Sequence, residues 1–458
     1  MAKSSAKLDM TQGSPVRLII LFAIPMLIGG VFQLMYNMVD TIVVGRFVSV
    51  KALAAIGATS STTSFLMMMG NGLTNAVSVV ISQAEGAKRQ DRMRRCVTHA
   101  VYLVLLSGLI LGLLAFFGAR PMMNLLGAPP DIIDQSVAYI QITGGLSIAL
   151  LCYNGVTSIL RAIGDSRTPL YFLIFSSLLN VALDLYFVVV LGGGVAGVAY
   201  ATVISQLAAA ALCTVYMLWR YPHLRPDTGA WGLDMDIIKE YLRIGLPMCV
   251  QSGVLCVGMF VITAVINSFG SDIVAAYTVG AKVEQLATIS FSNVAFSFSV
   301  YAGQNFGAKR FDRIKEGLRK GLVIVCSLAL ISTVVMLIFA KPLALIFMEN
   351  PSDYVLGASV SMVRIEAAFF LALGSIWTLN SALRGIGAVK VTLVSSIVEL
   401  TLKIGLSLLL PIFMGYIGIW LAAPIGWVLG IVPSAAYFLW WFKDPQGRSK
   451  SSALTKKA

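Results

Sequence analysis

The segment Gln83–Arg92 (QAEGAKRQDR) returns 221 positions later as Gln304–Arg313 (QNFGAKRFDR), with seven of the ten residues identical. A repeat whose period is close to half of the chain length indicates a protein made of two homologous halves. Long apolar segments surround both copies, so the repeat belongs to a membrane protein. Doubling of a membrane-helix bundle is typical of transporters.

Other pairs of segments keep nearly the same spacing, of 222 or 223 residues. They are SILRAIG at Ser158–Gly164 with SALRGIG at Ser381–Gly387, and Pro25-Met26 with Pro247-Met248. The two halves therefore correspond over most of their length. A proline inside a membrane helix frees backbone carbonyls and kinks the helix, which favours a bend in the first span of each half.

The composition is that of a chain embedded in lipid. Hydrophobic residues make up 58% and charged residues 12%, whereas soluble domains carry about 25% charged residues. A helix of about 20 apolar residues crosses the bilayer core. We predict an all-α membrane protein with twelve transmembrane helices, at 17–44, 52–81, 97–117, 134–158, 169–190, 195–218, 240–265, 274–300, 320–340, 356–380, 391–411 and 415–442.

These spans predict two six-helix lobes, 1–220 and 240–458, joined by a cytoplasmic linker at 221–239. Six spans per half is an even number, so both halves have the same orientation, with the substrate pathway between them. Most of the 34 Lys and Arg residues lie in alternate loops and in the two tails. By the positive-inside rule both termini are expected to be cytoplasmic, in the plasma (inner) membrane of a prokaryote.

Several other classes of protein are disfavoured. The net charge of +13 comes mainly from Lys and Arg in alternate loops and in the tails, as the positive-inside rule requires, so we expect no nucleic-acid partner. The six cysteines form no CxxC pair and are expected to be packing residues. The chain has no P-loop, nucleophile elbow or zinc-protease motif, so we expect neither an enzyme nor a protein with a bound cofactor.

Three sets of residues resemble the multidrug and toxic compound extrusion (MATE) transporters. They are Tyr36–Arg46 (YNMVDTIVVGR), the two GAKR loops and the paired LRxIG loops. The resemblance covers essentially the whole chain, with several motifs in register. It implies the twelve-helix MATE fold and export of organic compounds in exchange for a cation.

Carboxylates at membrane depth are costly and are therefore functional candidates. Asp40 lies roughly 9 Å from the outer end of span 1, and Asp184 and Thr202 lie about 12 Å deep on spans 5 and 6. Asn180 is one turn from Asp184 on the same face. Two carboxylates close together in a low-dielectric site repel, so at least one should hold a proton near neutral pH.

The same oxygen atoms suit Na⁺, because hard cations prefer oxygen ligands. In the DinF-like branch of the MATE family, positions matching Asp40, Asn180, Asp184 and Thr202 form the cation-responsive site, and this resemblance implies the same role here. The coupling ion is thus H⁺ or Na⁺, with Na⁺ as the one candidate metal. Hydrogen bonding of the two carboxylates within the bundle is the structural alternative.

Four further residues are candidates for the substrate cavity. They are Met35, Tyr36 and Met38 on span 1 and Glu284 on span 8. Polarizable Met surfaces suit promiscuous binding of apolar drugs, but core packing is the preferred explanation of the methionines. Glu284 either faces the cavity as a cation-attracting group or pairs with another helix.

Glu399 and Lys403 are four residues apart, the spacing of a helical ion pair, and occupy about the positions that Asn180 and Asp184 hold in the first half. We interpret Arg364 and Glu366 as packing charges. Whether Glu284, Glu399 and Lys403 take part in transport stays open at this stage.

The sequence therefore predicts a monomeric, cation-coupled antiporter that exports organic, cationic and amphipathic compounds by alternating access of two lobes. A flippase for lipid-linked or other amphipathic substrates keeps the architecture, but it is expected to have a larger, basic cavity. A membrane enzyme or sensor needs a catalytic constellation or a soluble domain, and neither is visible in the sequence.

Overall fold

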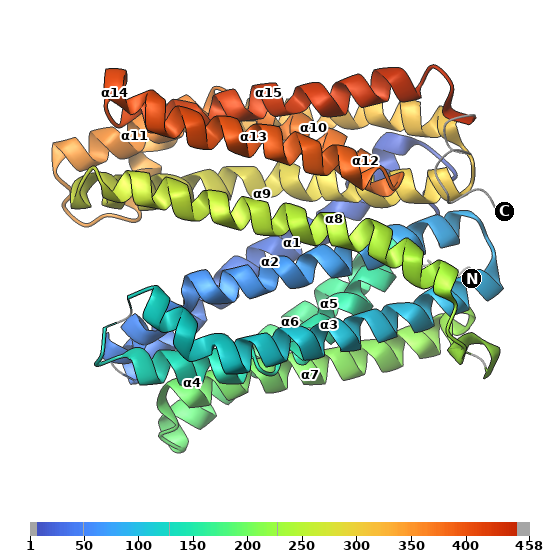
Figure 1. The fold of residues 1–458 in the computed structure, drawn as a ribbon, viewed down its shortest axis with the longest axis horizontal. Coiled ribbons are helices and arrows are strands. Elements are labelled where there is room, and N and C mark those ends of the chain that lie inside the picture. The colour runs from blue at the N-terminus through green and yellow to red at the C-terminus, as the bar shows by residue number, and fades with distance from the viewer. Residues whose placement is uncertain (1–6, 49, 128, 227, 447–458) are drawn as a thin grey trace. The chain divides into compact units, whose positions relative to one another are not determined.

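Backbone N–H and C=O groups find no water in hydrocarbon, so a spanning chain satisfies them within α-helices. The structure, a computed structural model, describes residues 7–48, 50–127, 129–226 and 228–446, without the side chains of 36–38, 40–42, 44–46, 50–54, 228 and 230. Every regular element within these ranges is a helix (Figure 1). The predicted all-α membrane fold is confirmed.

The first six predicted spans correspond to the helices up to residue 220. They are α1 (Pro15–Phe47), α2 (Val50–Gly86), α3 (Gln90–Leu125), α4 (Ile133–Thr143) with α5 (Ser147–Ala162), α6 (Arg167–Leu185), which continues as the π-helix η1 (Tyr186–Val190), and α7 (Gly194–Arg220). Two short 3₁₀ helices, η2 (Pro222–Leu224) and η3 (Thr228–Trp231), lie in the predicted linker.

The second half repeats this order. Its helices are α8 (Met235–Asn267), α9 (Ser271–Gly307), α10 (Phe311–Leu345), α11 (Asp353–Ala367) with α12 (Phe370–Gly385), α13 (Val389–Leu409), which is followed by the single turn α14 (Pro411–Met414), and α15 (Ile417–Trp441). The counterparts α2 and α9 are each 37 residues long.

The fourth span of each half is broken, which the sequence analysis did not predict. The chain bends by 43° between α4 and α5 and by 52° between α11 and α12. By length and composition, nine of the described helices qualify as membrane spans, or eleven with the two bent pairs. The twelfth predicted span is α9, which carries the charged residues Asp272, Lys282 and Glu284.

The repeated sequence produces the same turn in both halves. Lys88 and Lys309 follow the ends of α2 and α9 in the left-handed conformation, with φ of 54° and 58°. Their backbone N–H groups donate to the carbonyls of Glu85 and Phe306, both at 3.0 Å. A left-handed residue at this position ends a helix and satisfies its last carbonyls.

The described chain forms two compact units, and the boundaries between them fall within α1 and α8, the first helix of each half. Unit 1 comprises residues up to Asp9 and Ile24–Cys249, and unit 2 comprises Met10–Ala23 and the residues from Val250 onward. The start of α1 thus belongs to unit 2, and the start of α8 belongs to unit 1. The predicted lobe boundaries at 220 and 240 stay a prediction.

The last arginine of each repeat holds one of these two helix starts. In unit 1, Arg92 donates to Oε2 of Glu240 on α8 at 2.7 Å, and the hydroxyl of the adjacent Tyr241 donates to the Cys96 carbonyl at 2.9 Å. Arg92 therefore anchors the start of α8 in addition to adding positive charge on the predicted cytoplasmic side.

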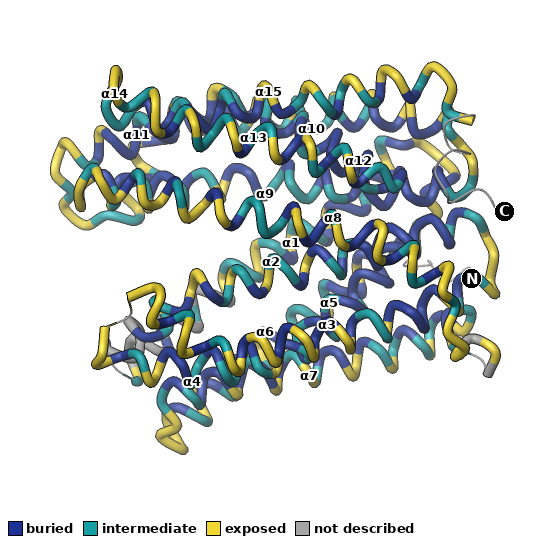
Figure 2. Tube along the Cα trace, viewed as in Figure 1, coloured by how far each residue is buried: buried dark blue, intermediate teal, exposed yellow. Residues whose placement is uncertain are grey.

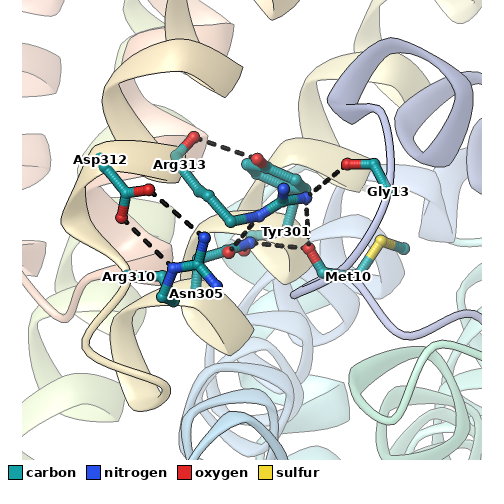
Figure 3. Close-up of polar contacts among 7 residues, drawn as sticks. All are labelled: Met10, Gly13, Tyr301, Asn305, Arg310, Asp312 and Arg313. Carbon is teal, nitrogen blue, oxygen red and sulfur yellow. Dashed lines mark hydrogen bonds and ion pairs between the residues drawn. The ribbon is translucent and has the colours of Figure 1, made fainter.

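In unit 2, Arg313 holds the segment that precedes α1 (Figure 3). It donates to the carbonyl of Gly13 at 2.9 Å and to Asn305 Oδ1 at 3.1 Å, and Asn305 donates to the Met10 carbonyl at 2.9 Å. The neighbouring Arg310 reaches Asp312 at 3.4 Å, and both of these side chains are more than half exposed.

Exposed residues run along whole helices (Figure 2), and many of them are large and apolar, consistent with the lipid-embedded fold. One such stripe follows α10 at the 3–4 residue spacing of a helix face. It contains Val323, Leu330, Ile331, Val334 and Ile338. The six cysteines form no disulfide, in line with their interpretation as packing residues.

Removal of the Arg313 side chain should destabilise the protein. Arg313→Ala loses charge-assisted hydrogen bonds to two carbonyl groups and one amide, which are buried or half-buried, so we expect the free energy of unfolding to fall by about 2 kcal/mol or more. Thermal unfolding of the purified protein in detergent measures this loss. Arg310→Ala is the control, with a change below about 1 kcal/mol expected; equal losses for both variants contradict the anchoring role of Arg313.

Candidate functional site

The turn between α6 and α7 places three of the predicted site residues next to one another. Asp184 lies in the last turn of α6, directly before the π-helical segment Tyr186–Val190. A π-helical insertion in an α-helix often marks a functional site. The chain then reverses through Gly192 and Gly194, whose φ values of +63° and +54° suit glycine.

Asn180 links the two helices through its side-chain amide. In the orientation that satisfies both neighbours, its nitrogen donates to Asp184 Oδ2 at 3.0 Å and its oxygen accepts from the Thr202 backbone N–H at 3.2 Å. The Thr202 hydroxyl donates to the Val198 carbonyl at 3.1 Å. The equal depths predicted for Asp184 and Thr202 thus correspond to an actual cluster.

This cluster is closed to solvent. Asn180 and Asp184 are both 0% exposed, and Thr202 is half-buried. Next to it along the chain, Val188, Val195 and Val198 form a buried apolar group at the turn. Burial of an ionised carboxylate is costly, and a proton or a cation at Asp184 lowers that cost by neutralising its charge.

The oxygen atoms available here suit both of these ions. The Asp184 carboxylate holds a proton, or combines with amide and hydroxyl oxygens of the kind that hard cations prefer. Among the described residues, no group of three or more His, Cys, Asp and Glu side chains is arranged to hold a metal ion. A sodium site at this cluster therefore has to draw on Asn180 and Thr202 as well as on carboxylates.

The remaining span 1 candidates are only partly described. The side chains of Asp40, Tyr36 and Met38 lie outside the described part of the structure. Met35 on α1 is 55% exposed. The structure therefore brings Asn180, Asp184 and Thr202 together and leaves the place of Asp40 a prediction.

Glu284 of α9 lies against Glu366 of α11 in unit 2, which is the structural alternative considered for it. The two carboxyl groups interact electrostatically with each other. The Lys403 ammonium acts electrostatically on both of them and on Glu399. The nearer residue in sequence, Lys282, lies instead over the ring of Phe347, at 5.7 Å from its centroid.

Sequence reasoning underestimated Glu366. Glu366 is 5% exposed, and its Oε2 has no hydrogen-bond partner among the described residues. It is the last residue but one of α11, directly before the bend to α12. A carboxylate in an apolar span is a signal in itself, but the adjacent Arg364 concealed it because the pair resembles ordinary packing charges.

Two homologous sets of membrane helices, each with buried carboxylates of its own, are typical of transporters. The MatE family model matches residues 25–186 and 247–409, once in each half. The chain belongs to the MatE family. The resemblance found in the repeated motifs is thereby confirmed, as is the prediction of a transporter rather than an enzyme.

Relatives with known names are similar in sequence to this chain over most of its length. The probable multidrug resistance protein YpnP of Bacillus subtilis is 28% identical over 439 residues, which cover 94% of this chain and 96% of the relative. DNA damage-inducible protein F of Escherichia coli is 25% identical over 292 residues, 63% of each chain.

Solved structures show the same fold. An outward-facing multidrug resistance MATE transporter of the MOP superfamily superposes with a TM-score of 0.86, at 23% identity, over 99% of this chain and 100% of its own. A MOP superfamily transporter from Pyrococcus furiosus superposes with a TM-score of 0.87, at 22% identity, over the full length of both chains. The two-lobe twelve-helix architecture is confirmed by these likenesses.

The hydrogen bonds of Asn180 predict an order of stabilities. Asn180→Ala removes the hydrogen bond to Asp184 Oδ2 and the one accepted from the Thr202 N–H, so we expect a loss of about 1–3 kcal/mol in the free energy of unfolding. Asp184→Asn keeps an oxygen that accepts from Asn180, and we expect it to cost less than Asn180→Ala. Thermal unfolding in detergent compares the two variants, and the reverse order contradicts the described geometry.

Proposed function

We propose that this protein is a cation-coupled antiporter that exports organic, cationic and amphipathic compounds in exchange for H⁺ or Na⁺. The observation that carries the proposal is the fully buried Asp184 carboxylate, bound to Asn180 and adjoining Thr202 in a transporter of the MatE family. The full cation site comprises Asp40, Asn180, Asp184 and Thr202, with Asp40 contributed by α1.

Coupling follows from linkage between cation and cargo. If the cation and the organic compound stabilise different conformers, binding of one promotes release of the other. Protonation or Na⁺ binding at Asp184 neutralises its charge, which changes the stability of the α6–α7 pair around it. The conformer with the neutralised site is the one that releases cargo outward.

The proposed class of cargo rests on charge and on the relatives. Several relatives are named as multidrug resistance proteins, which favours drug export over the flippase alternative. In unit 2 the three carboxyl groups of Glu284, Glu366 and Glu399 stand around one lysine, Lys403. This excess of carboxyl groups suits a cationic cargo better than a pyrophosphate. We place the protein in the plasma membrane of a prokaryote, as a monomer with both termini cytoplasmic.

The test is transport of a cationic dye by protein reconstituted in liposomes, with a pH gradient and a Na⁺ gradient imposed separately. A tenfold ion gradient supplies about 1.4 kcal/mol. One-for-one exchange then supports a dye gradient of about tenfold, and one of the two ions should produce it. Dye transport that ignores both gradients contradicts the proposal.

The same assay distinguishes the cation site from other carboxylates. Asp40→Asn and Asp184→Asn should each abolish gradient-driven transport, because neither variant can exchange a charge at the site. Asp134→Asn is the control, since this exposed residue only pairs with Arg120 at the surface, and it should transport like the unmodified protein. Full transport by Asp184→Asn removes that residue from the mechanism.

A further inference from the structure

A small basic cavity lies in unit 1, at the turn between α2 and α3 and away from the candidate cation site. Its volume is about 280 Å³, and its charged lining consists of Lys7, Glu85, Lys88, Arg89 and His223. These residues come from the N-terminal segment, the GAKR turn and the 3₁₀ helix after α7. The turn belongs to the membrane face that is predicted to be cytoplasmic.

The lining carries more positive than negative charge. Lys7 pairs with Glu85, and His223 Nε2 lies 3.9 Å from the other Glu85 oxygen. Lys88 and Arg89 are exposed and form no ion pair with any described residue. Three cations against one carboxylate leave two positive charges even when His223 is neutral.

The local backbone adds N–H donors to these side chains. Lys88 has a left-handed conformation, and Arg89 is the N-cap residue of α3 without a side-chain capping bond. The first N–H groups of a helix and its dipole favour an anion. Asp91 in the first turn of α3 opposes this, but it is not among the residues that line the cavity.

The second copy of the turn shares the left-handed lysine and the N-cap arginine, but it differs in the charges around them. Its arginine, Arg310, is engaged by Asp312 at 3.4 Å, whereas the equivalent Arg89 forms no such pair with Asp91. Lys7 and His223, which complete the cavity in unit 1, come from segments outside the repeated motif. The cavity in unit 1 is thus built on a turn that both copies share, completed by Lys7 and His223 from outside the repeat.

We propose that this cavity binds the phosphate group of an anionic ligand, either an acidic phospholipid headgroup or a soluble phosphate ester. Lys and Arg side chains and helix N-terminal N–H groups are the usual partners of phosphate. The cavity lies just below the size of typical small-molecule pockets, about 300 Å³, which suits a headgroup better than a drug. This proposal does not depend on the proposed transport function.

His223 makes binding depend on pH. Burial lowers the pKa of His223, the positive charges of Lys7 and Arg94 lower it further, and Glu85 opposes them; the ring of Tyr221 also packs against it at 6.1 Å. The free cavity therefore holds neutral imidazole near neutral pH. A bound phosphate favours the imidazolium and raises this pKa, so affinity should increase as the pH falls.

Two probes distinguish the two sources of phosphate. Binding of glycerol 3-phosphate to the full-length protein in detergent is measured by calorimetry, and retention of phosphatidylglycerol against phosphatidylcholine is measured by native mass spectrometry. Lys88→Ala/Arg89→Ala should weaken binding of the preferred probe at least tenfold. The matched control Lys309→Ala/Arg310→Ala, which makes the same charge change in the second copy, should bind like the unmodified protein.

Each outcome decides the proposal. Selective loss of phosphatidylglycerol in the first variant supports a lipid headgroup, and selective loss of glycerol 3-phosphate supports a soluble ester. Two further variants sharpen the test: Glu85→Gln should strengthen binding, and His223→Ala should remove its increase at low pH. Equal losses in the two double variants, or no binding of either probe, overturn the proposal.

Discussion

The constraint on which this structure depends is that a polar group inside the bilayer must find its partner within the protein. Helices meet this requirement for the backbone, and the few charged side chains inside the spans must meet it through their neighbours. Asp184 shows the result most clearly, because its carboxylate is fully buried and Asn180 donates to it at 3.0 Å. The side-chain amide of Asn180 also accepts a hydrogen bond from the Thr202 N–H of α7. The environment of one carboxylate is thus linked to the packing of α6 against α7.

The same constraint gives the repeated GAKR segments their structural role. Their last arginines, Arg92 and Arg313, hold the starts of α8 and α1 within units 1 and 2. Each of these two helices begins in one unit and continues in the other, and each contains a proline, Pro25 or Pro247, close to the point of change. These prolines therefore lie where α1 and α8 pass from one unit to the other.

Sequence reasoning predicted what apolar length and repetition determine. The twelve spans, the doubled architecture and the shared depth of Asp184 and Thr202 follow from counting residues along helices. The first bend was missed although Gly144 and Gly145 mark the break between α4 and α5. The second was missed because Ala368 and Phe369, at its break, carry no glycine or proline signal. Pairs of residues far apart in the sequence, such as Glu284 with Glu366 and Lys7 with Glu85, could not be predicted. They depend on tertiary packing, which no local sequence pattern specifies.

The central claim is that cation and cargo bind in exchange at a site that contains Asp184. Calorimetry of dye binding to the purified protein tests it directly, with titrations in buffers of different ionisation enthalpy and with and without Na⁺. The account predicts that each bound dye cation releases about one proton, or that Na⁺ weakens dye binding competitively, and that Asp184→Asn abolishes this linkage. Dye binding that is independent of both ions in the unmodified protein contradicts the account.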